Sequence, residues 1–375
     1  MTFKIVVIDD EDIGELIRNI NLDELSYDHV KPCSFKNDIE SISDTYDLIL
    51  MDQKLAGNIG KIPYMGTTLI QELRTRMAEG HLRSKPVILW SIAGNINSYQ
   101  NEKSSHNLVD AVWNKEWLHH GNVEKRNECA RIIRALINGY SNIRAIIEDF
   151  KFNSPNEPSK LASKAFDVDL DLVSEYIPEA VLGHLLNKNH HITHSLSNFF
   201  INSILRFNGF LIDEKTLAAR LGVDIQCSDW ETLRDKLPLS CKFSGIYSDL
   251  YERWWATEFE SWWLEFVYEE HAANLTAAER VDILNSTFNL SLKSAKPATK
   301  HTESRFWHCC IIDGVPIDEI DSYKVTSSER REWQDHFYAS FEAINLKRHK
   351  QLGYELTLRD KERFLKLRKE KKAYE

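Results

Sequence analysis

The stretch KIVVIDD, residues 4–10, decides how the first third of this chain folds, because a short apolar, β-branched run stops at two aspartates. Three further runs follow the same design: DLILMD (47–52), PVILWS (86–91) and DAVWNK (110–115). Runs of this kind are typical of buried strands in a parallel sheet, whose carboxyl ends face a ligand crevice. We therefore expect the polar residues that end the runs to meet at one edge: Asp9, Asp10, Asp52, Ser91 and Lys115.

Strand-like runs alternate with helical patterns over residues 3–120. HVKPCSF (29–35) supplies a fifth strand-like run. This alternation predicts an α/β domain with helices on both faces of a parallel sheet. A longer helical pattern over residues 123–150 predicts a closing helix that extends toward a second domain. The shorter helical patterns are EDIGELIRNI (11–20), NDIESISD (37–44) and GTTLIQELRTRM (66–77).

Length and composition indicate a folded protein of two or more domains. The chain has 375 residues, of which 42% are hydrophobic and 28% charged, as in ordinary globular proteins. The net charge of −10 argues against wholesale attraction to nucleic acid or anionic lipid. Residues 347–375 hold eleven Lys/Arg against five Asp/Glu, a balance of +6, so the preceding part carries −16.

Targeting signals and cysteine usage point to a cytoplasmic protein. The first strand-like run begins almost at Met1, and no apolar stretch approaches the length of a membrane span. The six cysteines show no CxxC spacing, which suits a reducing compartment. We expect a cytoplasmic location and no membrane contact.

Two breaks in composition set the expected domain boundaries. FNSPNEPSK (152–160) combines two prolines with small polar residues and is the best candidate for a linker. Beyond it the pattern is mostly helical. We expect an α/β domain over 1–125, an extended helix over 126–151, the linker, and a mostly helical output or interaction domain over 161–375 with a basic C-terminal tail.

The polar residues at the strand ends form a site suited to phosphoryl chemistry. Carboxylates are ligands that Mg²⁺ prefers, and Asp9, Asp10 and Asp52 supply three of them. The backbone carbonyl of Lys54 could add a fourth ligand. A carboxylate becomes a nucleophile toward phosphorus when cations and hydrogen-bond donors neutralise the developing charge. The hydroxyl of Ser91 and the ammonium of Lys115 could hold phosphoryl oxygens.

In order and spacing, these residues resemble the receiver domain of bacterial two-component response regulators, over about residues 1–125. The resemblance implies a flavodoxin-like (βα)5 fold over these residues, and the helical pattern beyond the linker predicts a mostly α-helical second domain after it. It implies that Asp52 accepts a phosphoryl group from a histidine kinase, that Asp9 and Asp10 bind Mg²⁺, and that Ser91 and Lys115 contact the phosphoryl group. Gly66 matches the glycine that usually opens the third helix. Such a domain catalyses its own phosphorylation and is not otherwise an enzyme.

The chain departs from the family pattern where the signal would be transmitted. The loop between Asp52 and Gly66 is longer than usual and lacks an early proline. Glu116 stands where a proline usually follows the lysine. Val112 occupies the position of the usual aromatic switch, and Trp113 lies on the opposite face of its strand by alternation. These differences put the usual aromatic relay in doubt.

The second half leaves several outputs open. We expect an interaction domain that acts on a downstream effector protein or through dimerisation. A phosphorylation-dependent transcriptional regulator is an alternative, because residues 216–222 resemble the opening of a helix-turn-helix. Nucleic acid is the less favoured partner, because residues 208–240 hold four basic against six acidic side chains. Receivers with unfamiliar tails also occur in anti-phage signalling, where one can act as a phosphate sink.

A histidine cluster raises a further alternative, a receiver-regulated enzyme with a metal site. His190 and His194 are four residues apart and would share a helix face, a spacing that can bind metal. His184 and His191 lie close by in the sequence. No third ligand of fixed spacing follows, so partly exposed helix histidines remain the simpler interpretation.

Overall fold

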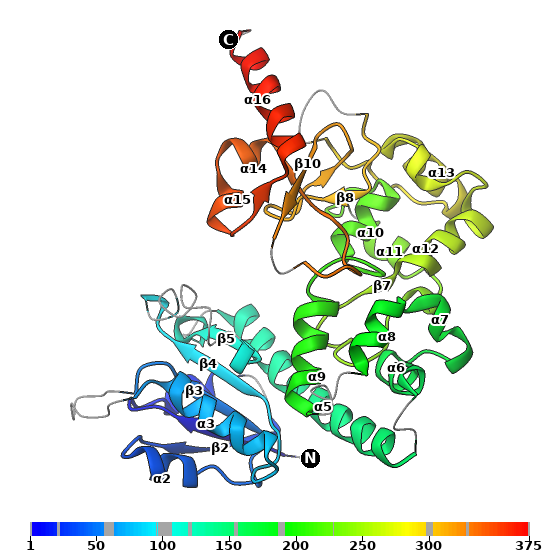
Figure 1. Cartoon of the computed structure of the whole chain (residues 1–375). Helices are drawn as coiled ribbons and strands as arrows, with labels where there is room; N and C mark the ends of the chain where they lie inside the picture. Colours follow the sequence, from blue (N-terminus) through cyan, green and yellow to red (C-terminus); the bar gives the residue numbers. More distant parts are fainter. Residues whose placement is uncertain are drawn as a thin grey trace. The chain divides into compact units, whose positions relative to one another are not determined.

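The structure is a computed structural model of the whole chain, shown in Figure 1. The chain forms two compact units, each described by itself below. Unit 1 contains residues 1–165 and 185–201, and unit 2 contains residues 166–184 and 202–375. The structure describes all residues except 1, 21–22, 56–63, 95, 97–106, 119–121, 154–156, 187–191, 228, 298–302, 328–329 and 374–375.

Unit 1 is built on a five-stranded sheet in the order β2-β1-β3-β4-β5, with every neighbouring pair parallel. This is the flavodoxin-like order, in which the carboxyl ends of the strands share one edge. Apolar residues fill the central strands, and β3 is buried along its whole length. The strands are β1 (Phe3–Ile8), β2 (Leu25–Val30), β3 (Leu48–Asp52), β4 (Val87–Ser91) and β5 (Ala111–Asn114).

Helices cover this sheet, as the alternation of patterns predicts. The long α5 closes the unit, and α9 returns to it from a later part of the chain and packs on α5. The bounds are α1 (Gly14–Arg18), α2 (Phe35–Glu40), α3 (Gly66–Ala78), the 3₁₀ turn η2 (Lys115–Leu118), α5 (Val123–Asn153), α6 (Pro158–Phe166) and α9 (Thr193–Phe199).

The second strand lies earlier than the sequence suggests. It spans Leu25–Val30 and not residues 29–35. Pro32 lacks the N–H that a ladder hydrogen bond requires, and Ser34 accepts a hydrogen bond from the backbone of Asn37 as the N-cap of α2. The chain therefore turns into α2 where the pattern suggests that the strand continues.

Unit 2 is mostly helical, as predicted, but it also contains short strands that the sequence did not reveal. A three-stranded sheet has the order β11-β10-β12, and two two-stranded sheets pair β6 with β7 and β8 with β9. The strands are β6 (Leu211–Ile212), β7 (Trp254–Trp255), β8 (His308–Cys309), β9 (Pro316–Ile317), β10 (Ser322–Thr326), β11 (Phe337–Ser340) and β12 (Glu355–Leu356).

The apolar cores of unit 2 include one around α10 and α13 and one around β10, β11 and α16. The tryptophan pairs at 254–255 and 262–263 are all buried. The bounds are η3 (Leu170–Leu172), α7 (Val173–Tyr176), α8 (Glu179–Leu185), η5 (Phe200–Leu205), α10 (Glu214–Leu221), α11 (Trp230–Arg234), η6 (Leu239–Cys241), α12 (Ala256–Trp262), η7 (Trp263–Val267), η8 (Ala272–Asn274), α13 (Ala277–Phe288), α14 (Phe341–Asn345), α15 (Arg348–Gln351) and α16 (Leu358–Ala373).

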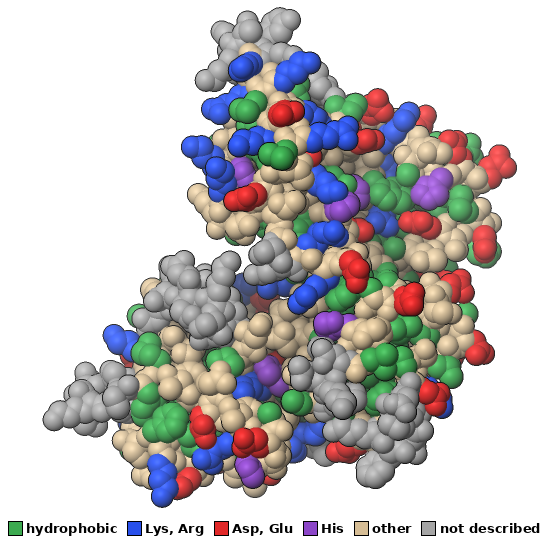
Figure 2. Space-filling view, viewed as in Figure 1, with side chains coloured by type: hydrophobic (Ala, Val, Ile, Leu, Met, Phe, Trp, Pro, Cys, Tyr) green, Lys and Arg blue, Asp and Glu red, His purple; other side chains and the backbone are tan. Residues whose placement is uncertain are grey.

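The basic tail forms α16, and Lys and Arg side chains are visible over it in Figure 2. Its inner face reaches the core of unit 2 through Phe364, while Leu358 is 83% exposed. Within the described part of the chain, no helix combines the length and apolarity that crossing a bilayer requires.

Candidate functional site

The polar residues at the strand ends come together at the carboxyl edge of the sheet in unit 1. Asp9 and Asp10 follow β1, Asp52 ends β3, Ser91 ends β4, and Lys115 follows β5. Carboxylate oxygens of the three aspartates lie within 4.8 Å of one another. All but Asp10 are buried. The fold therefore assembles residues that are up to 106 positions apart in the sequence, the separation of Asp9 and Lys115.

Lys115 is the cation of this cluster. Its Nζ lies 2.9 Å from Asp9 Oδ2, 3.4 Å from Asp52 Oδ2 and 3.3 Å from Glu11 Oε2. It also lies 5.4 Å from the centre of the buried Trp90 ring, within the range of a cation–π interaction. One ammonium group thus offsets the repulsion between two buried carboxylates.

The surroundings shift the proton affinities of these groups. Burial raises the pKa of Asp9, against the opposing effect of Lys115. Burial also raises the pKa of Asp52, to about 6, with a further increase from Asp9 and an opposing effect from Lys115 and from the Ser91 hydrogen bond. Burial would lower the pKa of Lys115, but the carboxylates of Asp9 and Asp52 outweigh it and raise the pKa. Lys115 is therefore held as a cation.

The residues present fit a hard divalent cation such as Mg²⁺. Asp52 Oδ1 is buried and has no hydrogen-bond partner among the described residues. A buried carboxylate oxygen normally has a partner, so this one is available to a ligand. The donor set consists of carboxylate oxygens, which suit Mg²⁺ better than softer metals.

Neighbouring groups hold the first aspartate in place. Asp9 Oδ1 accepts a hydrogen bond from the backbone N–H of Glu11, at 3.0 Å. His29 Nε2, at the end of β2, lies 2.9 Å from the Asp9 carbonyl oxygen. Neither Glu11 nor His29 was among the site residues expected from the sequence. For Glu11, the spacing of two residues from Asp9 was the one signal in the sequence. No signal in the sequence pointed to His29.

Gly66 is needed for steric reasons. A Cβ atom added there would lie 2.0 Å from the carbonyl oxygen of Asp52, far inside contact distance. The N–H of Gly66 donates to the carbonyl of Gln53, at 3.0 Å. The start of α3 therefore lies against the backbone of Asp52, and only glycine permits that approach.

The departures from the family pattern have clear local structures. Val112 packs with the core cluster beneath α3, whereas Trp113 is buried outside that cluster. This agrees with their expected positions on opposite faces of β5. Glu116 donates its N–H to Asn114 Oδ1 at 3.0 Å, so the turn after Lys115 forms without a proline. Most of the long loop between Asp52 and Gly66 lies outside the described residues, and a role of the Lys54 carbonyl stays a prediction.

The histidine cluster divides between the units. His194 lies in unit 1, where Nδ1 is 2.7 Å from the Tyr140 hydroxyl and Nε2 is 2.8 Å from the carbonyl of Asn107. Both ring nitrogens therefore contact protein groups. His184 lies in unit 2, with its ring centre 5.6 Å from that of Trp333. His190 and His191 lie outside the described residues, so a metal site with them stays a hypothesis.

The residues that suggested a helix-turn-helix form α10 in unit 2. The one arginine of this helix, Arg220, is buried and lies 3.4 Å from both Glu260 and Asp335. It also lies 4.8 Å from the Trp307 ring centre. The guanidinium of Arg220 is thus paired with carboxylates inside unit 2 and is not presented to a DNA phosphate.

No family model and no curated protein matches this chain. Among solved structures, it is similar to the signal receiver domain of a putative LuxO repressor from Vibrio parahaemolyticus, at 12% identity over 37% of this chain and 94% of that one, with a TM-score of 0.27. It is also similar to full-length FixJ from B. japonicum, at 13% identity over 54% and 100%, TM-score 0.28. The response regulator RcsB of Salmonella typhimurium has 11% identity over 52% and 98%, TM-score 0.23. At these scores the likeness adds no argument to the strand order and site geometry.

Proposed function

We propose that this chain is a response regulator that accepts a phosphoryl group on Asp52. The observation that carries the proposal is the state of that residue, since its buried Oδ1 has no partner while Lys115 lies 3.4 Å from its other oxygen. A structural aspartate buried to this degree would have its oxygens satisfied. This one has an oxygen left for chemistry.

In the proposed reaction, a histidine kinase presents a phosphohistidine to the edge of the sheet. An oxygen of Asp52 attacks the phosphorus, the P–N bond breaks, and its electron pair returns to the imidazole of the kinase. Lys115 and Ser91 hold the transferred oxygens, and Asp9 and Asp10 would hold Mg²⁺ together with Asp52. When bound, the ion supplies neutralisation of negative charge on the phosphoryl group.

In this proposal unit 2 carries the output through contact with a partner protein or a second copy. It exposes several large apolar side chains that a partner would cover, including Leu239 (90%), Leu358 (83%) and Phe266 (68%). A role as a phosphate sink in anti-phage signalling is one form of this function. The genes that flank this one would distinguish such a role from control of an effector.

Beryllofluoride, which mimics a bound phosphoryl group, tests the proposal. With Mg²⁺ present, we expect it to bind the native protein, as measured by calorimetry or by the fluorescence of Trp90 beside Lys115. Asp52→Asn should abolish binding, whereas Asp44→Asn, an exposed position in the same unit, should not. Equal binding by the native protein and Asp52→Asn would rule out the phosphoacceptor.

A further inference from the structure

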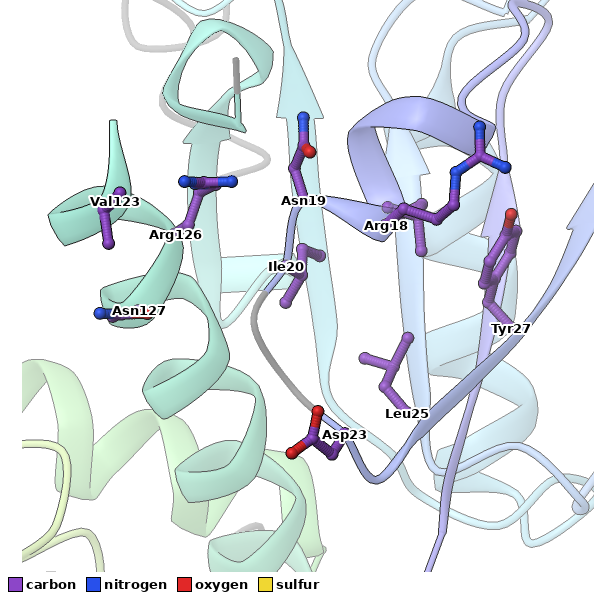
Figure 3. A pocket seen from close by; sticks show the side chains of 10 residues that line it. Arg18, Asn19, Ile20, Asp23, Leu25, Tyr27, Val123, Arg126 and Asn127 are labelled. Atoms are coloured by element: carbon purple, nitrogen blue, oxygen red, sulfur yellow. The ribbon is translucent and has the colours of Figure 1, made fainter. Parts of the chain in front are cut away.

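A second cavity lies in unit 1, apart from the acidic cluster. It has a volume of about 410 Å³ and lies between the end of α1, the start of β2 and the first turn of α5 (Figure 3). Its apolar lining includes Ile17, Ile20, Leu25 and Val123. Volumes of about 300–1,000 Å³ are usual for small-molecule sites. The cavity is therefore large enough for a metabolite.

Two arginines, Arg18 and Arg126, and the carboxylate of Asp23 line this cavity. Arg126 extends from α5 on the side that faces Asn19 (Figure 3). Its Nε is buried and has no hydrogen-bond partner within the described residues. Asp23 lies at another end of the cavity and forms no ion pair with any described residue. A partly desolvated guanidinium without a counter-charge is costly, and a planar oxyanion satisfies it through two parallel hydrogen bonds.

We propose that this cavity binds a small molecule that carries one phosphate or carboxylate group, held by Arg126. The first turn of α5 adds favourable positive partial charge on that side. At the other end, the Asp23 carboxylate repels a second negative charge and accepts a hydrogen bond from an ammonium or hydroxyl group of the same ligand. The Asp23 end of the cavity thus favours a cationic or hydroxyl group of the ligand over a second anionic group.

The cavity is joined to the phosphoacceptor site by one hydrogen bond. Asn19, in the cavity wall, donates from Nδ2 to the carbonyl of Leu118 at 2.8 Å. Leu118 ends the 3₁₀ turn that Lys115 begins. A ligand that engages Asn19 would therefore act on the turn that positions Lys115. This regulatory part rests on the proposed function of Asp52, whereas the binding part does not.

Inorganic phosphate is the probe for binding, with EDTA present so that no metal occupies the acidic cluster. We expect phosphate, compared with chloride at equal ionic strength, to raise the melting temperature of the native protein more than that of Arg126→Gln. Arg134→Gln, an exposed position on the same helix outside the cavity, is the matched control and should behave as the native protein. The general stabilisation of folded proteins by phosphate is common to all three. An equal rise in all three would overturn the proposal.

Asp23→Asn gives a test that loss of folding cannot mimic. Removing the repelling carboxylate should tighten phosphate binding by about twofold, because the exposed position of Asp23 leaves its charge partly screened by water. Calorimetric titration in EDTA measures this change, and unchanged or weaker binding would overturn the proposal even if Arg126→Gln did not fold.

The link to the acidic cluster is tested with beryllofluoride and Mg²⁺. Phosphate should change the beryllofluoride affinity of the native protein by about threefold or more beyond the change that it causes in Arg126→Gln. Direct competition between phosphate and beryllofluoride at Asp52 affects both proteins equally, so this difference excludes it. Asn19→Ala should keep phosphate binding and lose this extra change. The same change in all three proteins would remove the regulatory link alone, and absence of beryllofluoride binding in every protein would instead reject the phosphoacceptor function.

Discussion

Asp52 and Asp110 are both buried at ends of the same sheet, yet their surroundings differ sharply. Asp52 ends β3 at the carboxyl edge, with Oδ1 unpartnered among the described residues. Asp110 precedes β5 at the amino edge. It accepts hydrogen bonds from Arg74 at 2.8 Å, from the Val87 N–H at 2.8 Å and from the Tyr140 hydroxyl at 2.7 Å. Asp52 thus keeps one oxygen without a hydrogen-bond partner among the described residues, whereas both oxygens of Asp110 accept hydrogen bonds.

The two pKa shifts have opposite directions for this reason. Burial raises the pKa of Asp52 to about 6, and Lys115 offsets only part of the effect. Burial would also raise the pKa of Asp110, but Arg74 and His194, whose Nδ1 lies 3.7 Å from Asp110 Oδ1, outweigh it, and the pKa falls well below its usual range. Equal burial therefore has opposite consequences: Asp110 stabilises the fold as a carboxylate, while Asp52 as a carboxylate costs stability. The difference marks which aspartate is available for chemistry.

Asp110 also joins elements that are distant in the sequence. Arg74 belongs to α3, Tyr140 to α5 and His194 to α9, all within unit 1. His194 Nε2 lies 2.8 Å from the carbonyl of Asn107, just before β5. This network fixes α9, which follows residues 166–184 of unit 2 in the sequence, to the rest of unit 1.

Asp110→Ala should produce the largest effect. It leaves the buried guanidinium of Arg74 without its counter-charge, so we expect a loss of about 3–5 kcal/mol in the free energy of unfolding. Denaturant titration at neutral pH measures it. The loss should shrink in acid, because the contribution of Asp110 is present above the ordinary aspartate pKa and is lost as the pH falls through its lowered value.

Asp44→Ala is the control for this prediction, since Asp44 is exposed in the same unit. We expect a change within about 1 kcal/mol at that position. If Asp110→Ala lowered the free energy of unfolding by no more than this, the hydrogen bonds around Asp110 would not stabilise the sheet. The contrast with Asp52 would then fail.

The sequence was sufficient to predict the carboxyl edge of the sheet but not the amino edge. Asp9, Asp52 and Lys115 each follow a clear apolar run, and parallel strands place such residues together by topology alone. Asp110 begins one of the same runs, yet its partners Arg74 and His194 lie 36 residues before it and 84 after it. No periodicity links them, because tertiary packing creates that network.

Other features also depended on packing that a single sequence does not show. Gly66 could be assigned to the start of α3, but its contact with the Asp52 carbonyl becomes evident only in three dimensions. The spacing of His194 from His190 gave no sign of the contacts that its ring nitrogens make with Tyr140 and Asn107. The strands of unit 2 are two to five residues long, too short for alternation to reveal.

Asp52→Asn should have an intermediate effect of opposite sign. The pKa of Asp52 in the folded protein, about 6, lies above the unfolded value of 3.8, so the folded state binds more protons in this window. Ionisation of Asp52 therefore costs stability above about pH 6 and costs none below about pH 4. We expect Asp52→Asn to gain roughly 1–3 kcal/mol at pH 7.5 and little at pH 4, by denaturant titration without divalent ions.

Asp110→Asn provides the matched comparison for Asp52→Asn, because both convert a buried carboxylate to an amide. At pH 7.5 it should destabilise the protein where Asp52→Asn stabilises it. Two changes of the same sign would show that burial alone, and not the set of partners, determines how each aspartate affects stability.

Tyr140→Phe should have the smallest effect and sharpens the contrast most. It removes one hydroxyl that contacts both Asp110 and His194, while Arg74 and the Val87 N–H remain on the carboxylate. We expect a loss of about 1 kcal/mol, with faster amide hydrogen exchange confined to α9 and the adjoining part of α5. Tyr46→Phe is the control, because the Tyr46 hydroxyl donates to the more exposed Asp28 at 2.8 Å, away from α9.

If α9 exchanged at the native rate in Tyr140→Phe, packing against α5 would hold this helix without the network. If exchange in α9 rises, the Asp110 network both stabilises the sheet and holds in unit 1 a helix that lies in the sequence between two segments of unit 2.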